Sequence, residues 1–192
     1  IMRGLPAPPE SFYNSRQFLF LQLLEDFEFM KNFSSKLSAS QQAERLLPPQ
    51  RRVKAVLDTD AYNEIDDQFA ILYAMLSPEK IDLQAIYAAL FYNGRSSSPA
   101  DGMEKSYQEI LKICGLTGRD PEGFVFRGCR APLEGPELPQ ESEAVNDLIR
   151  KARQASPDDP LYVIGIGACT NIASAILKCP EIIENLVVVW LG

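Results

Sequence analysis

Five carboxylate side chains fall within ten residues, in the segment DTDAYNEIDD at positions 58–67. They belong to Asp58, Asp60, Glu64, Asp66 and Asp67. Like charges packed this closely repel one another unless a bound cation, protonation or full solvation relieves them. Because the chain contains no histidine and its cysteines are scattered, the oxygen-rich cluster favours a hard cation, calcium or magnesium, over zinc.

A second interpretation of this cluster is a solvated acidic loop that caps a helix. Asp66 or Asp67 would then lie near the positive N-terminus of that helix. Asp58 and Asp60 argue for more than capping, because they alternate with Thr59 and share one side of the strand if it continues. A capping role needs one acid rather than five, so the cluster predicts a cation site.

The acidic cluster lies between a predicted strand and a predicted helix. The apolar run at 53–57 is typical of a buried strand, and residues 68–76 are typical of a helix. In an open α/β sheet, the loop after a strand lies at the carboxyl end of that strand, where ligands bind. The carboxylates are therefore expected at a ligand-binding edge.

Strands and helices alternate along the rest of the chain. The sequence predicts strands at 82–89, 124–128, 161–166 and 186–191, and helices at 101–115, 142–155 and 171–178. This alternation predicts right-handed βαβ crossovers and an α/β fold, a mostly parallel sheet with helices on both faces. The functional loops should meet at one edge, which would carry the acidic cluster, Asn93, Arg127 and the segment 167–171.

Two further signals concern boundaries. Asp101 and Glu104 resemble a capping box, with Asp101 as the N-cap of a helix that Gly115 would end. The last predicted strand, 186–191, is apolar and no covering helix follows it, so we expect a domain that is incomplete at its C-terminus.

The segment GACTN at 167–171 has two interpretations. Gly167, Thr170 and Asn171 are expected at a turn from strand to helix because of backbone geometry and N-capping alone. Beside the acidic cluster, the same loop can supply a backbone carbonyl, which is a favoured calcium ligand.

The composition bounds the class of protein. With 192 residues, 46% of them hydrophobic, the chain is long enough for one α/β domain with a sizeable core. The formal net charge of −7 and the pI near 4.7 argue against a surface for nucleic-acid phosphates. The four cysteines lack C-x-x-C spacing, which favours reduced thiols in a cytoplasmic protein.

Residues 1–50 are predicted to form a helical N-terminal extension that precedes a domain at 51–192. The segment 11–47 has the composition of one or two helices with aromatic faces, suited to packing on the domain or on a second subunit. The apolar run at 18–24 is followed by acidic residues instead of a cleavage site, which argues against a signal peptide. It is also shorter than the roughly 20 apolar residues that span a bilayer.

Four motifs together resemble a known family. The sequences VLDTD, IDDQFAI, GACTNIASAILKCPEI and VVVWLG are similar to segments of the nucleoside hydrolases, calcium-dependent N-ribohydrolases related to inosine-uridine hydrolase. The resemblance covers residues 53–192 and implies a nucleoside hydrolase-like, Rossmann-like domain. The spacer AYNEI between Asp60 and Asp66 is two residues longer than the three-residue P-G-[IL] spacer of the family, so the chain resembles a variant with a longer loop.

The resemblance implies a role for each matching residue. Asp60 and Asp67 would ligate Ca²⁺, together with the backbone carbonyl of Thr170. Asp60 would also be the catalytic base that takes a proton from a calcium-bound water, and Asp66 and Asn93 would bind the ribose. Leu191 would fall near a position that packs on the sugar or the base.

The resemblance further implies an enzyme that hydrolyses the N-glycosidic bond of a ribonucleoside to ribose and free base. Members are commonly homo-oligomers, dimers or tetramers. The family's later calcium-binding Asp, its ribose-binding Asn and Glu, and a His present in many members follow the position where this chain ends. We therefore expect the sequence to be the first part of a longer polypeptide.

Two other functions are compatible with parts of the sequence. A hydrophobic strand followed by Asp-x-Asp is also the signature of haloacid-dehalogenase-like phosphohydrolases, in which Asp58 would be the nucleophile and Mg²⁺ the cofactor. The phosphohydrolase hypothesis explains neither the Asp66–Asp67 pair nor the GACTN loop. The other is a non-catalytic calcium- or ribose-binding fragment.

Overall fold

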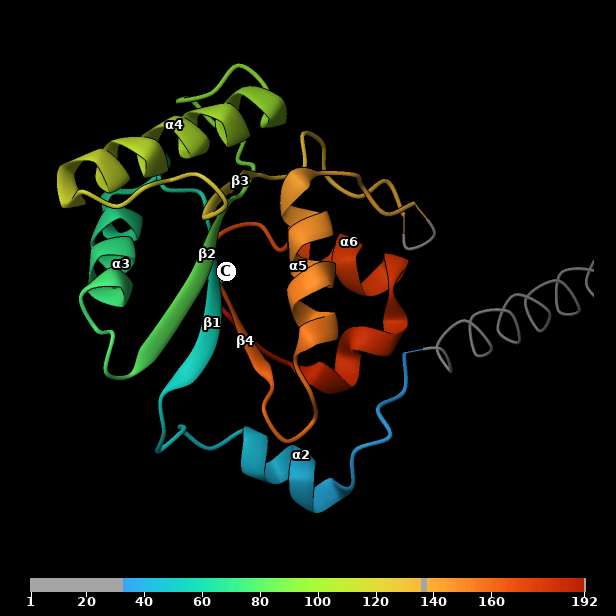
Figure 1. The fold of residues 1–192 in the computed structure, drawn as a ribbon. Helices are drawn as coiled ribbons and strands as arrows, with labels where there is room; N and C mark the ends of the chain where they lie inside the picture. Colours follow the sequence, from blue (N-terminus) through green and yellow to red (C-terminus); the bar gives the residue numbers. More distant parts are fainter. Residues whose placement is uncertain (1–32, 136–137, 192) are drawn as a thin grey trace, which may run out of the picture. The chain divides into compact units, whose positions relative to one another are not determined.

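The computed structural model describes residues 33–135 and 138–191 (Figure 1). The chain divides into two compact units, Ile1–Ser35 and Lys36–Gly192, and the helices and strands described below belong to the second. Most of the predicted helical extension lies outside the described residues. Within them, α2 (Ala39–Arg45) is a short helix that begins with a capping box at Ser38. The boundary between residues 50 and 51 stays a prediction.

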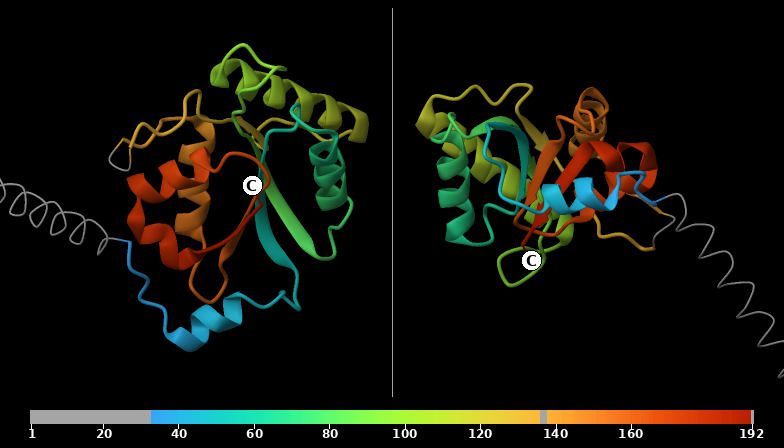
Figure 2. Two further views of the ribbon diagram at one scale, coloured as in Figure 1. Left: turned by 180° about the vertical axis from the view of Figure 1, so that it is seen from behind. Right: turned by 90° about the horizontal axis from the view of Figure 1, so that it is seen from below.

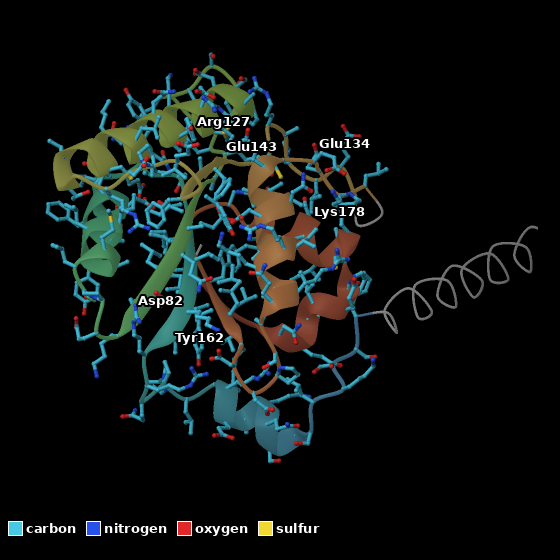
Figure 3. All side chains as sticks on the ribbon, viewed as in Figure 1. Asp82, Arg127, Glu134, Glu143, Tyr162 and Lys178 are labelled. Carbon is cyan, nitrogen blue, oxygen red and sulfur yellow. The ribbon has the colours of Figure 1, made fainter. Side chains whose placement is uncertain are left out.

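Five parallel strands form one sheet in the order β3-β2-β1-β4-β5, which confirms the predicted α/β fold. The strands are β1 (Val53–Thr59), β2 (Ile81–Ala88), β3 (Val125–Arg127), β4 (Leu161–Gly165) and β5 (Leu186–Trp190). Because the strands run the same way, their carboxyl ends share one edge of the sheet. Figure 3 shows this polarity: Asp82 and Tyr162, near the starts of β2 and β4, lie far from Arg127 and Glu143, at the end of β3 and the start of α5.

Helices cover both faces of the sheet. Helices α3 (Ile65–Met75) and α4 (Pro99–Thr117) lie on one side, and α5 (Glu143–Gln154) and α6 (Thr170–Lys178) lie on the other (Figures 1 and 2). A 3-10 helix, η1 (Pro180–Asn185), links α6 to β5 and has no counterpart in the prediction from sequence. Among the helices of the described residues, none is long and apolar enough to cross a membrane.

The core lies between the central strands and the inner faces of the helices. Val56, Ile86 and Val163 from three neighbouring strands are fully buried, and Met103 and Leu148 from α4 and α5 belong to the same cluster. Each such side chain contributes about 1.5–3 kcal/mol through its burial. This packing fixes the strand ends from which the functional loops begin.

The predicted caps of α4 were wrong by a few residues. Ser98 is the N-cap, and its hydroxyl accepts a hydrogen bond from the N–H of Asp101 at 3.1 Å. Asp101 lies in the first turn instead, where its carboxylate accepts from the N–H of Ser97 at 2.8 Å. At the other end the helix continues past Gly115 to Gly118, whose φ of 70° allows the left-handed cap.

The two edges of the sheet differ. At β3, the backbone N–H groups of Val125 and Arg127 donate to the carbonyl of Pro121 (2.9 Å) and to Oε2 of Glu143 (3.2 Å), not to a strand. At β5, no further strand pairs within the described residues. The β5 side chains of Val188, Val189 and Trp190 are 44%, 52% and 52% exposed.

We predict that Gly102→Ala destabilises the domain. A Cβ at Gly102 would lie 2.0 Å from the backbone carbonyl oxygen of Phe91, so α4 would have to move away from the β2 loop. The expected loss is about 1–3 kcal/mol of unfolding free energy, measured by urea denaturation. The matched control is Gly115→Ala in the same helix, where a Cβ meets nothing within 4 Å and the gain should be about 0.5–1 kcal/mol. Equal stability of the two variants would contradict the packing described here.

Candidate active site

A cleft of about 550 Å³ opens at the carboxyl edge of the sheet. Four of the five clustered acids line it: Asp60, Glu64, Asp66 and Asp67. The facing wall consists of the loop after β4 and the end of β5, with Ile166, Gly167, Ala168, Trp190 and Leu191. The predicted convergence of the loops after β1 and β4 is therefore found.

A larger hollow of about 810 Å³ lies elsewhere, along β3 between α4 and α5. Tyr107, Phe126, Glu143 and Arg150 are among the residues that line it. Arg127, expected at the functional edge, is held by Glu104 through two hydrogen bonds of 2.9 and 3.1 Å, outside the acidic cleft. The smaller cleft is the candidate site because two buried carboxylates, those of Asp60 and Asp67, meet there.

Asp58 is the most deeply buried of the acids, at 1% exposure. Its Oδ1 accepts a hydrogen bond of 3.1 Å from Nδ2 of Asn171, whereas its Oδ2 has no partner in the described part of the chain. Removal from water raises the pKa of the Asp58 carboxyl to about 7. Asp58 is not among the residues that line the cleft, and its burial therefore favours a protonated carboxyl or one whose charge a cation compensates.

Asp60 follows β1 directly and is 7% exposed. Its Oδ2 accepts a hydrogen bond of 3.0 Å from Nδ2 of Asn63. A Cβ at Gly167 would lie 2.8 Å from Oδ1 of Asp60, so only glycine lets the β4 loop approach this carboxylate so closely. Burial is the main cause that raises the pKa of Asp60, and the charges of Glu64 and Asp66 add to it.

Asp67 lies in the first turn of α3 but points into the protein. It is 6% exposed, and its Oδ1 accepts a hydrogen bond of 2.5 Å from the hydroxyl of Thr59. Burial raises its pKa to about 6, with smaller contributions from Asp60 and the neighbouring acids. Glu64 is the N-cap of α3 yet makes no side-chain capping bond. The simple capping interpretation therefore does not account for Asp67, although Asp66 beside it is exposed.

No lysine or arginine of the described segments forms an ion pair with Asp58, Asp60 or Asp67. Their desolvated carboxylate oxygens, including the unpartnered Oδ2 of Asp58, are the type of donor that a hard cation prefers. A closed site is not formed, because residues 33–135 and 138–191 hold no group of three or more acidic or cysteine side chains arranged to bind a metal ion.

Asn171 joins the loops at this edge, a role not predicted from the sequence. It is 1% exposed, and its Nδ2 donates to Asp58 and to the carbonyl of Ala88 (3.3 Å), while its Oδ1 accepts from the N–H of Cys129 (2.7 Å). A Cβ at Gly128 would lie 2.5 Å from Nδ2 of Asn171. The side chain thus bridges the ends of β1 and β2 and the loop after β3, and Thr170 beside it begins α6.

The remaining predicted residues lie near the cleft in different ways. Asn93 is exposed and donates from Nδ2 to Oδ1 of Asn63 at 2.6 Å, which connects it indirectly to Asp60. Leu191 lines the cleft and is 77% exposed. Trp190, which was not predicted, lines it too, and its indole Nε1 donates to the carbonyl of Gly167 at 2.9 Å.

Comparisons with known proteins identify the family and the fold. The sequence profile described as inosine-uridine preferring nucleoside hydrolase matches residues 55–192. Among solved structures, the chain is similar to an inosine-guanosine nucleoside hydrolase (IG-NH), with 22% identity and a TM-score of 0.56 over 73% of this chain and 49% of that one. A type III effector protein, XopQ, complexed with adenosine diphosphate ribose, is less similar, with 13% identity and a TM-score of 0.45 over 81% of this chain and 48% of that one. No curated protein sequence gives a match.

A parallel sheet with a polar cleft at its carboxyl edge defines the broad class of ligand-binding α/β proteins. Within that class, the chain belongs to the inosine-uridine preferring nucleoside hydrolase family, which confirms the resemblance found in its motifs. The similarity to IG-NH shows the shared fold, and the chain spans about half the length of that structure.

We predict that, in the presence of a metal chelator, the domain loses stability as the pH rises from about 4 to about 7. The pKa values of Asp58 (about 7) and Asp67 (about 6) exceed the value near 3.9 of an unfolded chain. The folded state therefore binds more protons in this range, and its free energy of unfolding falls with rising pH. Asp58→Asn should flatten this dependence and stabilise the domain at pH 8 by on the order of a few kcal/mol.

The measurement is urea unfolding at pH 5 and pH 8 in the presence of the chelator. The control is Asp158→Asn, which removes an exposed carboxylate before the start of β4, at the opposite end of that strand from the cleft, and should leave the pH dependence as in the wild type. An unchanged pH dependence in Asp58→Asn would show that Asp58 is ionised in the folded state without penalty.

Proposed function

We propose that this chain contributes to the active site of a calcium-dependent N-ribohydrolase, which cleaves the N-glycosidic bond of a ribonucleoside to give ribose and the free base. The observation that carries the proposal is the meeting of Asp60 and Asp67, both buried and without a cationic partner among the described residues, in a cleft of a nucleoside hydrolase family member. The similar structure is named as a hydrolase of inosine and guanosine, which supports a nucleoside as the substrate.

The proposed metal ligands are the carboxylates of Asp60 and Asp67 and the backbone carbonyl of Thr170. All three are hard oxygen donors, the type that Ca²⁺ prefers. When bound, Ca²⁺ would supply a positive charge that makes a nearby water more acidic and offsets the repulsion among the acids. A bound cation would also lower the raised pKa values of Asp60 and Asp67.

Asp60 is the proposed general base. Its carboxylate takes one proton from the attacking water while the water oxygen bonds to the anomeric carbon of the ribose. The bond from that carbon to the base nitrogen breaks, and its electron pair leaves with the base, which then takes up a proton. The bound cation would keep the Asp60 carboxylate ionised, as a general base must be before it accepts a proton.

Asp66 and Asn93 are proposed to bind the ribose hydroxyls. Asp66 is exposed, lines the cleft and can accept hydrogen bonds from a sugar. Asn93 is exposed and bonded to the cleft residue Asn63, and its amide can donate or accept hydrogen bonds. The acids facing the ribose also favour the positive charge that develops on the sugar ring as the glycosidic bond breaks. The sequence contains no histidine, so a histidine of these 192 residues does not protonate the departing base.

A cytoplasmic location and a homo-oligomer, dimer or tetramer, remain part of the proposal. The first rests on the scattered cysteines, which are free thiols in the structure. The second rests on the family resemblance alone.

The first test is calcium binding by titration calorimetry on this chain, with and without free ribose. We expect calcium binding that ribose strengthens. Asp67→Ala should weaken calcium affinity by more than about tenfold, the range seen even for residues that only support a metal ligand. Asp82→Ala is the matched control, because Asp82 lies at the opposite end of the sheet beside Arg52 (Figure 3).

Turnover is tested with the full-length protein on a panel of ribonucleosides. Release of free base that requires calcium and fails in Asp60→Ala supports the hydrolase. Binding of calcium and ribose without any release of base would instead support a non-catalytic binding role. If the full-length protein neither binds calcium nor releases free base, the proposed function is refuted.

A further inference from the structure

The loop between Asp60 and Asp66 places an amide group against the proposed base. In this loop, Nδ2 of Asn63 donates to Oδ2 of Asp60 at 3.0 Å. On its other side, Oδ1 of Asn63 accepts from Nδ2 of Asn93 at 2.6 Å. Asn63 therefore stands between the proposed base and a proposed ribose-binding residue.

The direction of these hydrogen bonds is set by chemistry. An ionised carboxylate only accepts, so the NH₂ group of Asn63 must face Asp60 and its oxygen must face Asn93. Asn93 must then present its own NH₂ group to Asn63, which leaves its oxygen for the N–H of Arg95 at 2.9 Å. All three bonds are directed toward Asp60, and reversing either amide would break two of them.

Neighbouring contacts hold Asn63 in place. The N–H of Asn63 donates to the carbonyl of Asp60 at 2.7 Å, and the guanidinium of Arg95 donates to the carbonyl of Asn63. The preceding Tyr62 stacks on Phe91, with ring centroids 6.4 Å apart. The loop after β1 is thus tied to the loop after β2 on both sides of Asn63.

We propose that Asn63 is a positioning residue that couples the carboxylate of Asp60 to the ribose contact of Asn93. This inference rests on the proposed N-ribohydrolase function. The bond to Oδ2 fixes the rotation of the Asp60 carboxylate and leaves Oδ1, on the side of Gly167, for the ion and the water. Movement of Asn93 when a ribose binds is thereby transmitted to Asp60, the proposed catalytic base.

Two substitutions distinguish the bond of Asn63 to Asp60 from its bond to Asn93. Asn63→Asp keeps an acceptor for Asn93 but removes the donor to Asp60, so kcat of the full-length protein should fall at least tenfold while KM changes less than threefold. Asn63→Ala removes both bonds, so kcat should fall and KM should rise by about threefold or more. Asn146→Asp, an exposed residue outside the cleft, controls for the added negative charge and should change neither constant.

A double-mutant cycle tests the coupling itself. If the arrangement acts as a unit, the rise in KM caused by Asn93→Ala should be much smaller in the Asn63→Ala background than in the wild type. Independent, multiplicative effects, or an Asn63→Asp protein with wild-type kcat, would overturn the proposal.

A measurement that needs no activity keeps the proposal testable if the hydrolase function fails. In NMR spectra of this chain, Asn63→Ala should shift the side-chain amide resonances of Asn93 toward those of a solvated amide, whereas Asn146→Asp should leave them in place. Unchanged Asn93 amide resonances in folded Asn63→Ala protein would refute the hydrogen-bond arrangement. Lack of calcium binding and turnover in the wild-type full-length protein would refute the function instead.

Discussion

Desolvation of carboxylates at the end of β1 is the constraint on which the site depends. Asp58, Asp60 and Asp67 are nearly removed from water, and no lysine or arginine of the described residues compensates them. Their raised pKa values share one leading cause, burial. A fold that buries acids in this way makes itself less stable near neutral pH unless a cation is bound, so ligand affinity and folding stability become linked through the same groups.

The parallel sheet is what allows these acids to be buried together. Polar groups at the ends of β1 and β2 and on the loop after β3 meet around Asn171 of α6, which makes three hydrogen bonds in the interior. Gly128 and Gly167 leave the space that this meeting requires, because a Cβ at either position would overlap a side chain of the site. The apolar core below supplies the stability, and these few polar bonds supply the alignment of the loops.

Much of the fold could be predicted from the sequence because its signals are local. Runs of apolar residues between helices located all five strands to within two residues, and their alternation with helices predicted that the strands run parallel, although not their order in the sheet. The caps of α4 were misplaced because Ser98 and Asp101 are both good capping residues and only the backbone geometry chooses between them. Asp60, Asp66 and Asp67 were recognisable as candidate site residues from their spacing. The bonds of Asn63 to Asn93 and of Asn171 to Asp58 were not predicted, because these partners lie 30 and 113 residues away along the chain and only the folded loops bring them together.

The unequal edges of the sheet have a consequence for how this domain can be extended. At β3 the outward N–H groups are already occupied by Pro121 and Glu143, so that side offers little for another strand to bond to. Any additional strand, from any polypeptide, would therefore align with β5, whose apolar residues are exposed. Because Trp190 ends β5 and also lines the acidic cleft, such a strand would bring its own end to the cleft wall. Growth of the sheet and enclosure of the cleft would thus be a single event.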